Sequence, residues 1–215
     1  MNVEAAFHVV YLTGPPATGK STVAALLKRS VQPIQIISYS AMLEGYINAQ
    51  STEAVTVTEL RRHSATRVPP EVVAAVDQSL IELVSKQRHS THIIIDSHPV
   101  TKEEFGFRVT AFSIPILQAL APTMICMLYA DSYTIQDRLE VSSEGRKPES
   151  AFEIEMHRSL QASLATVYGI AAGVPIYFLD SSKPPRDVAH EIAKRLQAKN
   201  PETSYEPTSA EGDSA

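Results

Sequence analysis

The sequence predicts an α/β protein with a five-stranded parallel sheet and helices on both of its faces. Short apolar runs alternate with longer amphipathic segments, the pattern of repeated strand–helix units in a parallel sheet. The chain has 215 residues, 44% of them hydrophobic, enough for one good core in a single domain. The expected strands are 7–12, 34–37, 92–96, 123–129 and 174–179, and the expected helices are 21–29, 41–49, 71–88, 111–121, 151–173 and 186–198, with a further helix opening at Asp131.

The first two strands follow from apolar runs and their boundaries. Residues 7–12 (Phe-His-Val-Val-Tyr-Leu) predict a buried strand, and residues 21–29 predict the amphipathic helix after it. Pro33 marks the start of the second strand and Ser38-Tyr39-Ser40 its end. Residues 50–58 are polar and β-branched, so we expect a connecting segment there.

Prolines and caps delimit the later elements. Pro69 and Pro70 precede a helix with an apolar stripe, and a polar loop is expected over 101–110. Pro122 precedes the fourth strand, and Asp131 supplies a helix N-cap. Pro175 lies near the beginning of the fifth expected strand, and a proline there is typical of a strand start or of an edge strand.

The loop between the first strand and the first helix has the pattern G-x-x-x-x-G-K-[ST], which is a phosphate-binding loop. Its glycines let the backbone bring N–H groups against phosphate oxygens, and the helix adds its positive end. We expect Lys20 to reach the β- and γ-phosphates of a nucleotide and Ser21 to bind Mg²⁺. An ordinary glycine turn is the alternative, which the flanking strand and helix disfavour. The predicted nucleotide-binding residues are Gly14, Pro15, Pro16, Ala17, Thr18, Gly19, Lys20, Ser21 and Thr22.

An acidic residue closes the third strand. Residues 92–95 are apolar until Asp96, which is the Walker B arrangement, so we expect Asp96 to hold Mg²⁺. The alternative is a strand-end cap. Ser97 follows where an oligomeric ATPase of the AAA type would carry glutamate, which argues against that class. No other histidine lies at metal-ligand spacing from His98, so we place His98 near the substrate rather than on a metal.

Residues after the second strand are candidates for a second substrate. Ligands of open parallel sheets collect at the carboxyl ends of strands, which places Tyr39 and Ser40 near the acceptor. Helix capping by Ser40 is the alternative. The pair Arg61 and Arg62 would clamp an anion, or would belong to a solvated helix face.

The segment 142–150 is short, polar and contains Gly and Pro, which is typical of a moving lid between two helices. Arg146 and Lys147 would carry its charge. A plain helix–helix connection is the alternative. Arg138, in the second turn of the preceding helix, should project near the strand ends.

Composition narrows the class of protein. No apolar run approaches the ~20 residues of a membrane-spanning helix and no signal segment is apparent, so we expect a cytoplasmic protein. The net charge of −5 gives no footprint for duplex nucleic acid, although a local RNA contact stays open. Cys126 lies in an apolar run and should be core. Residues 200–215 are polar and predict a disordered tail.

These motifs resemble the nucleoside monophosphate kinases, and within them the archaeal-type adenylate kinases, over residues 7 to about 196. The stretch Ile-Ile-Asp96-Ser97-His98 is similar to that family's Ile-Ile-Asp-Thr-His, and Pro69-Pro70-Glu71 and Gly106-Phe107 also have counterparts. The resemblance implies a sheet ordered 2-3-1-4-5, ATP and Mg²⁺ as cofactors, and a kinase domain over 1–199 with an acceptor-binding segment at 39–70.

The same resemblance assigns roles to further residues. Arg138 would lie along the base and phosphates of ATP, and the loop Asp180-Ser-Ser-Lys183-Pro184 would touch adenine. Lys20, Arg138 and Arg146 would be catalytic. The chain departs from the family at Tyr39-Ser40-Ala41, where an acid is missing, and at Ala162, where an arginine is expected; Arg158, one turn earlier, could substitute.

Three functions remain open at this stage. The first is an enzyme that moves the γ-phosphoryl of Mg·ATP to a nucleoside monophosphate, AMP before others. The second is a nucleotide-dependent switch or assembly ATPase, and the third is a kinase of another small acceptor. Nucleotides are the expected partners, and the sequence leaves monomer and homo-oligomer open.

Overall fold

The computed structural model describes residues 7–50, 68–103, 105–141 and 150–197. Its elements, in chain order, are β1 (Val9–Thr13), α1 (Lys20–Ser30), β2 (Ile34–Ser38), α2 (Tyr39–Gln50), α4 (Pro70–Gln87), β3 (His92–Asp96), β4 (Val100–Glu103), β5 (Gly106–Val109), α5 (Ile114–Leu120), β6 (Met124–Tyr129), α6 (Ser132–Val141), α7 (Ala151–Ala172), β7 (Ile176–Asp180) and α8 (Pro185–Gln197). Among the described helices, none is long and apolar enough to cross a membrane.

The five strands of the main sheet are parallel and lie in the order β2-β3-β1-β6-β7. Numbered by their order in the chain, this is 2-3-1-4-5, which confirms the predicted topology. All five residues of β1 are buried, because the strand is central and both of its faces are covered. β7 is an edge strand that begins directly after Pro175, as the proline predicts.

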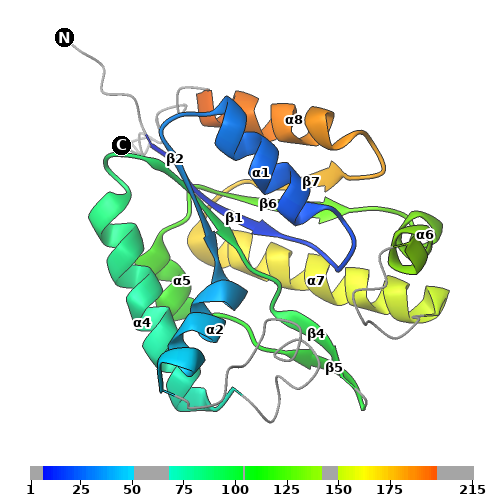
Figure 1. The fold of residues 1–215 in the computed structure, drawn as a ribbon, viewed down its shortest axis with the longest axis horizontal. Helices are drawn as coiled ribbons and strands as arrows, with labels where there is room; N and C mark the ends of the chain where they lie inside the picture. The colour runs from blue at the N-terminus through cyan, green and yellow to red at the C-terminus, as the bar shows by residue number, and fades with distance from the viewer. Residues whose placement is uncertain (1–6, 51–67, 104, 142–149, 198–215) are drawn as a thin grey trace, which may run out of the picture.

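Helices cover both faces of the sheet (Figure 1). α1 and α8 pack on one face around the side chains of Leu12, Leu27 and Ile192. α4, α5 and α7 pack on the other face around Tyr11, Leu80 and Tyr168. The sheet is therefore the middle layer of three, and its strand ends are left open at the two edges of the sandwich.

A hairpin stands where a polar loop was predicted over 101–110. β4 and β5 pair antiparallel, with Thr101 opposite Arg108. The hairpin packs against α7: Lys102 pairs with Glu153 at 3.1 Å, and the His157 ring N–H donates to the Val100 carbonyl at 3.0 Å. These stabilising contacts come from residues about fifty positions further along the chain, which is why the local sequence pattern did not predict them.

Cys126 is fully buried in the core between α1, α8 and the sheet, as predicted. Burial raises the pKa of its thiol to about 12, so the thiol stays protonated and unreactive at neutral pH. Several predicted features lie outside the described residues: most of the acceptor-binding segment with Arg61 and Arg62, the lid residues 142–149 with Arg146, and the tail 200–215.

Candidate nucleotide-binding site

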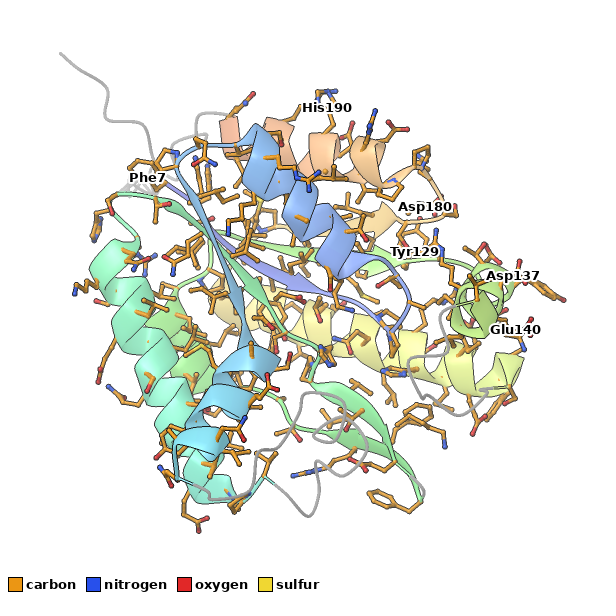
Figure 2. All side chains as sticks on the ribbon, viewed as in Figure 1. Phe7, Tyr129, Asp137, Glu140, Asp180 and His190 are labelled. Atoms are coloured by element: carbon orange, nitrogen blue, oxygen red, sulfur yellow. The ribbon has the colours of Figure 1, made fainter. Side chains whose placement is uncertain are left out.

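A cavity of about 650 Å³ opens at the carboxyl ends of the parallel strands. Figure 2 shows Tyr129 and Asp180 at this end of the sheet, close to Asp137 on α6, with Phe7 at the opposite end. The cavity is lined by the loop between β1 and α1, the ends of β2 and β3, α6, and the start of α8. This is the edge where ligands of open α/β sheets bind.

Backbone geometry explains the two glycines of the phosphate loop. Gly14 has φ 147°, and a Cβ there would lie 2.4 Å from the carbonyl oxygen of Leu128 on the neighbouring strand β6. Gly19 has φ 78° and is the left-handed N-cap of α1. Ala17 is also left-handed, at φ 58°, and Thr18 Oγ1 donates to the Pro15 carbonyl at 2.8 Å. The loop is thus tightly wound, with close backbone packing that only glycine permits at position 14.

Lys20 is the first residue of α1, and its ammonium folds back over the loop. Its Nζ donates to the carbonyls of Gly14 at 2.6 Å and Pro15 at 2.9 Å. Residues 16–22 of the loop line the cavity, and the carbonyls of Gly14 and Pro15 hold the ammonium beside it. A mobile cation and a helix N-terminus therefore meet at one wall of the cavity, which is the arrangement that binds polyphosphates.

Ser21 and Asp96 line the same cavity from α1 and from the end of β3. A hydroxyl and a carboxylate are hard oxygen ligands of the kind that Mg²⁺ prefers, and nucleotide phosphates and water usually complete its shell. Within the described residues, no group of three or more His, Cys, Asp or Glu side chains could hold a metal alone. The two side chains fit a Mg²⁺ shared between protein and nucleotide, and that ion would neutralise charge on the phosphates.

Arg138 connects two loops at the cavity. Its guanidinium donates to the carbonyl of Ala17 at 3.3 Å and to that of Ser181 at 2.7 Å. The predicted N-cap of α6 is present, since Asp131 accepts from the Thr134 N–H at 2.9 Å; hydrogen bonds from Thr134 hold the pKa of that carboxyl below its usual range. Arg138 therefore lies near the strand ends, as expected, fixed between the phosphate loop and the loop after β7.

The loop after β7 contributes residues other than those predicted. Lys183 and Pro184 are exposed and lie outside the cavity lining, whereas Ser181 and Pro185 line it. Ser181 is held by its neighbour strand, because its N–H donates to the Tyr129 carbonyl at 2.7 Å. The register between β6 and β7 therefore places Ser181 at the cavity, and the sequence of the loop alone does not reveal that register.

The residues after β2 divide between two roles. Ser38 and Ser40 line the cavity, and the cap of α2 is Ser38, whose Oγ accepts from the Ala41 N–H at 3.4 Å. Tyr39 points elsewhere: its hydroxyl donates to Asp77 at 2.6 Å, and its ring packs edge-on against Phe112. Ser40 and His98 thus line the cavity, and Tyr39, which was predicted to meet the second substrate, instead supports the site from the core.

Besides Ser38, Ser181 and Pro185, the sequence did not predict four residues that line the cavity, namely Val23, Asp137, Val141 and Val188. Asp137 and Val141 lie on the same helix as Arg138, and Val188 comes from α8. Helical spacing from Arg138 could have pointed to Val141, but nothing local marks Val188. Arg158, which could replace an expected arginine, donates to the Ala130 carbonyl at 3.3 Å and to Glu155 at 2.6 Å, at the junction of β6 and α6.

The chain was compared with models of known protein families and with known proteins. A family model described as an AAA domain matches residues 13–155, which is more than half of the chain. No curated protein sequence was found to match.

Solved structures share the fold at low sequence identity. Shikimate kinase from Bacteroides thetaiotaomicron is 15% identical with a TM-score of 0.57, covering 89% of this chain and 99% of that one. A tunicamycin resistance protein from Deinococcus radiodurans is 13% identical with a TM-score of 0.56, covering 90% and 97%. A sugar kinase from a Janibacter species is 14% identical with a TM-score of 0.50, covering 88% and 94%. The chain therefore belongs to the AAA-domain family, and its fold is that of the P-loop kinases.

Proposed function

We propose that the protein is an ATP-dependent phosphotransferase that moves the γ-phosphoryl group of Mg·ATP to a nucleoside monophosphate, AMP before others. One observation carries this proposal: Lys20, Arg138 and Asp96 line the same cavity as Ser38, Ser40 and His98, three residues that we call the acceptor wall. The cations and the metal-binding carboxylate suit the donor triphosphate, and the polar groups of the acceptor wall suit an acceptor.

The chemistry of the acceptor wall favours a phosphate over an alcohol. An alcohol must lose its proton as it attacks, so kinases of alcohols place a base beside it. A phosphate monoester has a second pKa of about 6 and is already ionised at neutral pH. A carboxylate at the end of β2 could serve as that base. The residue at this place is Ser38, which pairs in register with Asp96 and has no carboxylate. The described carboxylates of the cavity are Asp96, assigned to Mg²⁺, and Asp137 beside Arg138 on α6.

Each residue of the donor side then has a task. Lys20 would exchange the carbonyls of its own loop for β- and γ-phosphate oxygens, which bind a cation more strongly. Arg138 would contact the donor between the phosphate loop and the loop after β7. His98 would meet the acceptor phosphate, together with Arg61 and Arg62, and Arg146 would approach the transferring group. The reaction needs mainly positioning and charge stabilisation, so this set requires no covalent intermediate.

The test is an acceptor panel. ADP formation from Mg·ATP is followed alone and with AMP, CMP, GMP, UMP, shikimate and a sugar, with the Lys20→Ala protein as the blank. We expect AMP to stimulate ADP formation most, with one AMP consumed for every two ADP formed, because the donor and the acceptor each become ADP. Stimulation by shikimate or the sugar instead would assign the cavity to an alcohol acceptor.

The family match supports one other candidate, a switch or assembly ATPase of the AAA kind. Ser97, where such enzymes would carry an activating glutamate, speaks against it. In the same assay this candidate predicts steady ADP release from ATP alone, which no acceptor on the panel increases.

A further inference from the structure

Four buried polar side chains form a chain under the nucleotide cavity. Gln161 on α7 is 1% exposed, Thr13 at the end of β1 is 0%, Tyr11 on the same strand is 1%, and Ser97 after β3 is 4%. All lie on the face of the sheet that α7 covers, where the surrounding core is largely apolar. We call these four residues the polar chain.

The polar chain links α7 to both halves of the site. The Gln161 side-chain amide donates to Thr13 Oγ1, and Thr13 directly precedes Gly14 of the phosphate loop. Burial raises the pKa of the Tyr11 hydroxyl, the Ser97 and Thr13 hydroxyls lower that pKa, and within the described residues the Tyr11 hydroxyl makes no hydrogen bond. Ser97 directly follows Asp96, the predicted metal ligand. The polar chain therefore begins at a helix, touches the base of the phosphate loop and ends next to Asp96.

Its burial opposes folding. Within the described residues, the Gln161 Oε1 and the Tyr11 hydroxyl have no hydrogen-bond partner, although both atoms are buried. A buried polar group without a partner destabilises the folded state, and an apolar side chain of the same size would not. Burial raises the pKa of Tyr11, so its hydroxyl stays neutral at any physiological pH. The polar chain destabilises the fold and lies directly under the nucleotide cavity. Its presence is explained if it serves the function of that cavity.

Backbone pairing between β1 and β3 ends beside the polar chain. The last pair is Leu12 opposite Asp96, and the Ser97 N–H donates to the Leu12 carbonyl at 3.1 Å, while Thr13 still pairs with Met127 of β6. Beyond these contacts the phosphate loop and the residues after Asp96 leave the sheet, so the polar chain adds to what sets their separation. α7 is a firm support for them, because His157 and Arg158 also bond it to the carbonyls of Val100 and Ala130.

We propose that Gln161 and Thr13 are positioning residues that hold the base of the phosphate loop at a set distance from Asp96, so that Ser21 and Asp96 can bind the same Mg²⁺. Mg²⁺ demands near-ideal octahedral geometry with oxygen ligands at about 2 Å, so a small shift between the two ligands weakens its binding. The inference rests on the assignment of Mg·ATP as the donor. It is independent of the acceptor.

The experiment measures ATP affinity by calorimetry with and without Mg²⁺, in the whole chain. Thr13→Val and Gln161→Met remove one hydrogen-bonding group each at nearly constant size. In these two variants we expect the tightening of ATP binding by Mg²⁺ to fall by about 10-fold or more, the effect of losing groups that orient metal ligands. Tyr11→Phe removes a hydroxyl that makes no hydrogen bond within the described residues and should keep the Mg²⁺ effect. ATP affinity without metal should stay within about 3-fold, since the loop itself is intact.

Two controls separate positioning from general loss of stability. Thr13→Ser keeps the hydroxyl and should retain the Mg²⁺ effect of the parent. Thr123→Val removes a hydroxyl at the opposite end of the sheet, where Thr123 Oγ1 donates to the Val9 carbonyl at 3.1 Å. It should lower the melting temperature like the test variants and leave the Mg²⁺ effect unchanged.

Three results would overturn the proposal. The first is a normal Mg²⁺ effect in folded Thr13→Val or Gln161→Met protein. The second is a loss of equal size in Thr123→Val, which would make the effect one of stability. The third is ATP binding that Mg²⁺ does not change in the parent. None of these binding results depends on the acceptor panel, so failure of the polar chain and failure of the monophosphate kinase proposal are distinguishable.

Discussion

At the scale of single residues, the cavity depends on a few charges held by backbone carbonyls. Lys20 and Arg138 both donate to carbonyls of the phosphate loop, at Gly14, Pro15 and Ala17. These contacts hold both cations at the cavity wall that the phosphate loop forms, and the carbonyls that hold them carry no net charge. Removing one cation should therefore impair nucleotide chemistry and leave the core untouched.

Lys20→Ala should lower kcat by at least about 10²-fold, because the donor phosphates lose their direct cation. The melting temperature should change little, since Lys20 packs against no core side chain. Lys28→Ala, an exposed lysine in the last turn of the same helix, is the matched control and should behave as the parent. Near-normal turnover in a folded Lys20→Ala protein would remove Lys20 from the mechanism.

Asp96→Asn should lower kcat by at least about 10²-fold and raise the Mg²⁺ concentration needed for half-maximal rate, because the amide is a poorer metal ligand. A Mg²⁺ titration of the steady-state rate measures both quantities. Asp137→Asn changes the other carboxylate of the cavity in the same way and should leave the Mg²⁺ requirement unchanged. Identical titrations for Asp96→Asn and the parent would reduce Asp96 to a strand-end residue.

Arg61 and Arg62 should differ from Arg146 in their kinetic signatures. Loss of a charged hydrogen bond worth about 1.5 to 3 kcal/mol should raise the KM for AMP by roughly 10- to 150-fold in Arg61→Lys or Arg62→Lys, with the KM for ATP barely changed. Lysine keeps the charge but loses the planar two-donor geometry. Arg146→Ala should lower kcat more than either KM. Steady-state kinetics with AMP and ATP varied separately would refute this if neither arginine at 61 and 62 affects AMP.

At the scale of elements, α2 packs on α4 through the apolar side chains of Leu43 and Ile47 and is linked to α4 by a hydrogen bond from Tyr39. No residue of α2 is fully buried, yet Tyr39 in its first turn donates to Asp77 of α4. Burial raises the pKa of Asp77, and the Tyr39 hydroxyl partly opposes that rise. Since Ser40 next to Tyr39 lines the cavity, this link also sets the acceptor wall.

Tyr39→Phe should reduce the free energy of unfolding by about 1–3 kcal/mol at pH 7, because the Asp77 carboxylate is left buried without its donor. A folded-state pKa above the unfolded value means that stability is fully present below the unfolded pKa and is lost as pH rises through the folded pKa. The mutant should therefore lose more at pH 7 than near pH 4. Urea unfolding at both pH values measures this, with exposed Tyr133→Phe as the control. Equal losses at the two pH values would show that the carboxylate is not involved.

At the scale of the whole molecule, the two ends of the sheet do different work. The carboxyl ends carry the cavity, and the amino ends close the core with stacked rings of His8 and His92, whose centroids are 5.8 Å apart. His92 Nδ1 accepts the His8 backbone N–H at 3.1 Å, and His8 Nδ1 lies 3.0 Å from Thr123 Oγ1. Accepting that bond requires Nδ1 to be unprotonated. Burial, and then the nearby His8 ring, lower the pKa of His92.

Stability should therefore fall in acid through His92. Its folded-state pKa lies below the ordinary value of about 6.5, so its contribution is full above that pH and is lost as pH falls through the folded-state pKa. His92→Asn keeps an acceptor near Nδ1 and cannot titrate. When the pH is lowered from 7.5 to 5, the melting temperature should decrease more in the parent than in His92→Asn. Both proteins contain His8, so the difference between them comes from residue 92. Parallel curves would exclude His92 as the titrating group.

The sequence by itself determined the parallel sheet, its strands, the phosphate loop and the acid at the end of β3. Each of these is a contiguous pattern: the strands are runs of apolar residues, and the loop from Gly14 to Thr22 is a fixed spacing whose glycines meet local backbone demands. The strand order followed from the resemblance to a kinase family. Local pattern suffices here because the physical cause, burial on both faces or a left-handed turn, acts within a few residues.

Only the tertiary structure decided which side chains support the site. The hairpin of β4 and β5 exists because α7 covers it, and Tyr39 turns away from the cavity because Asp77 lies 38 positions further along the chain. Gln161 reaches the base of the phosphate loop from 148 positions away. Hydrogen bonds between buried groups so far apart depend on how helices pack on the sheet, and no local period or spacing in the sequence encodes that packing.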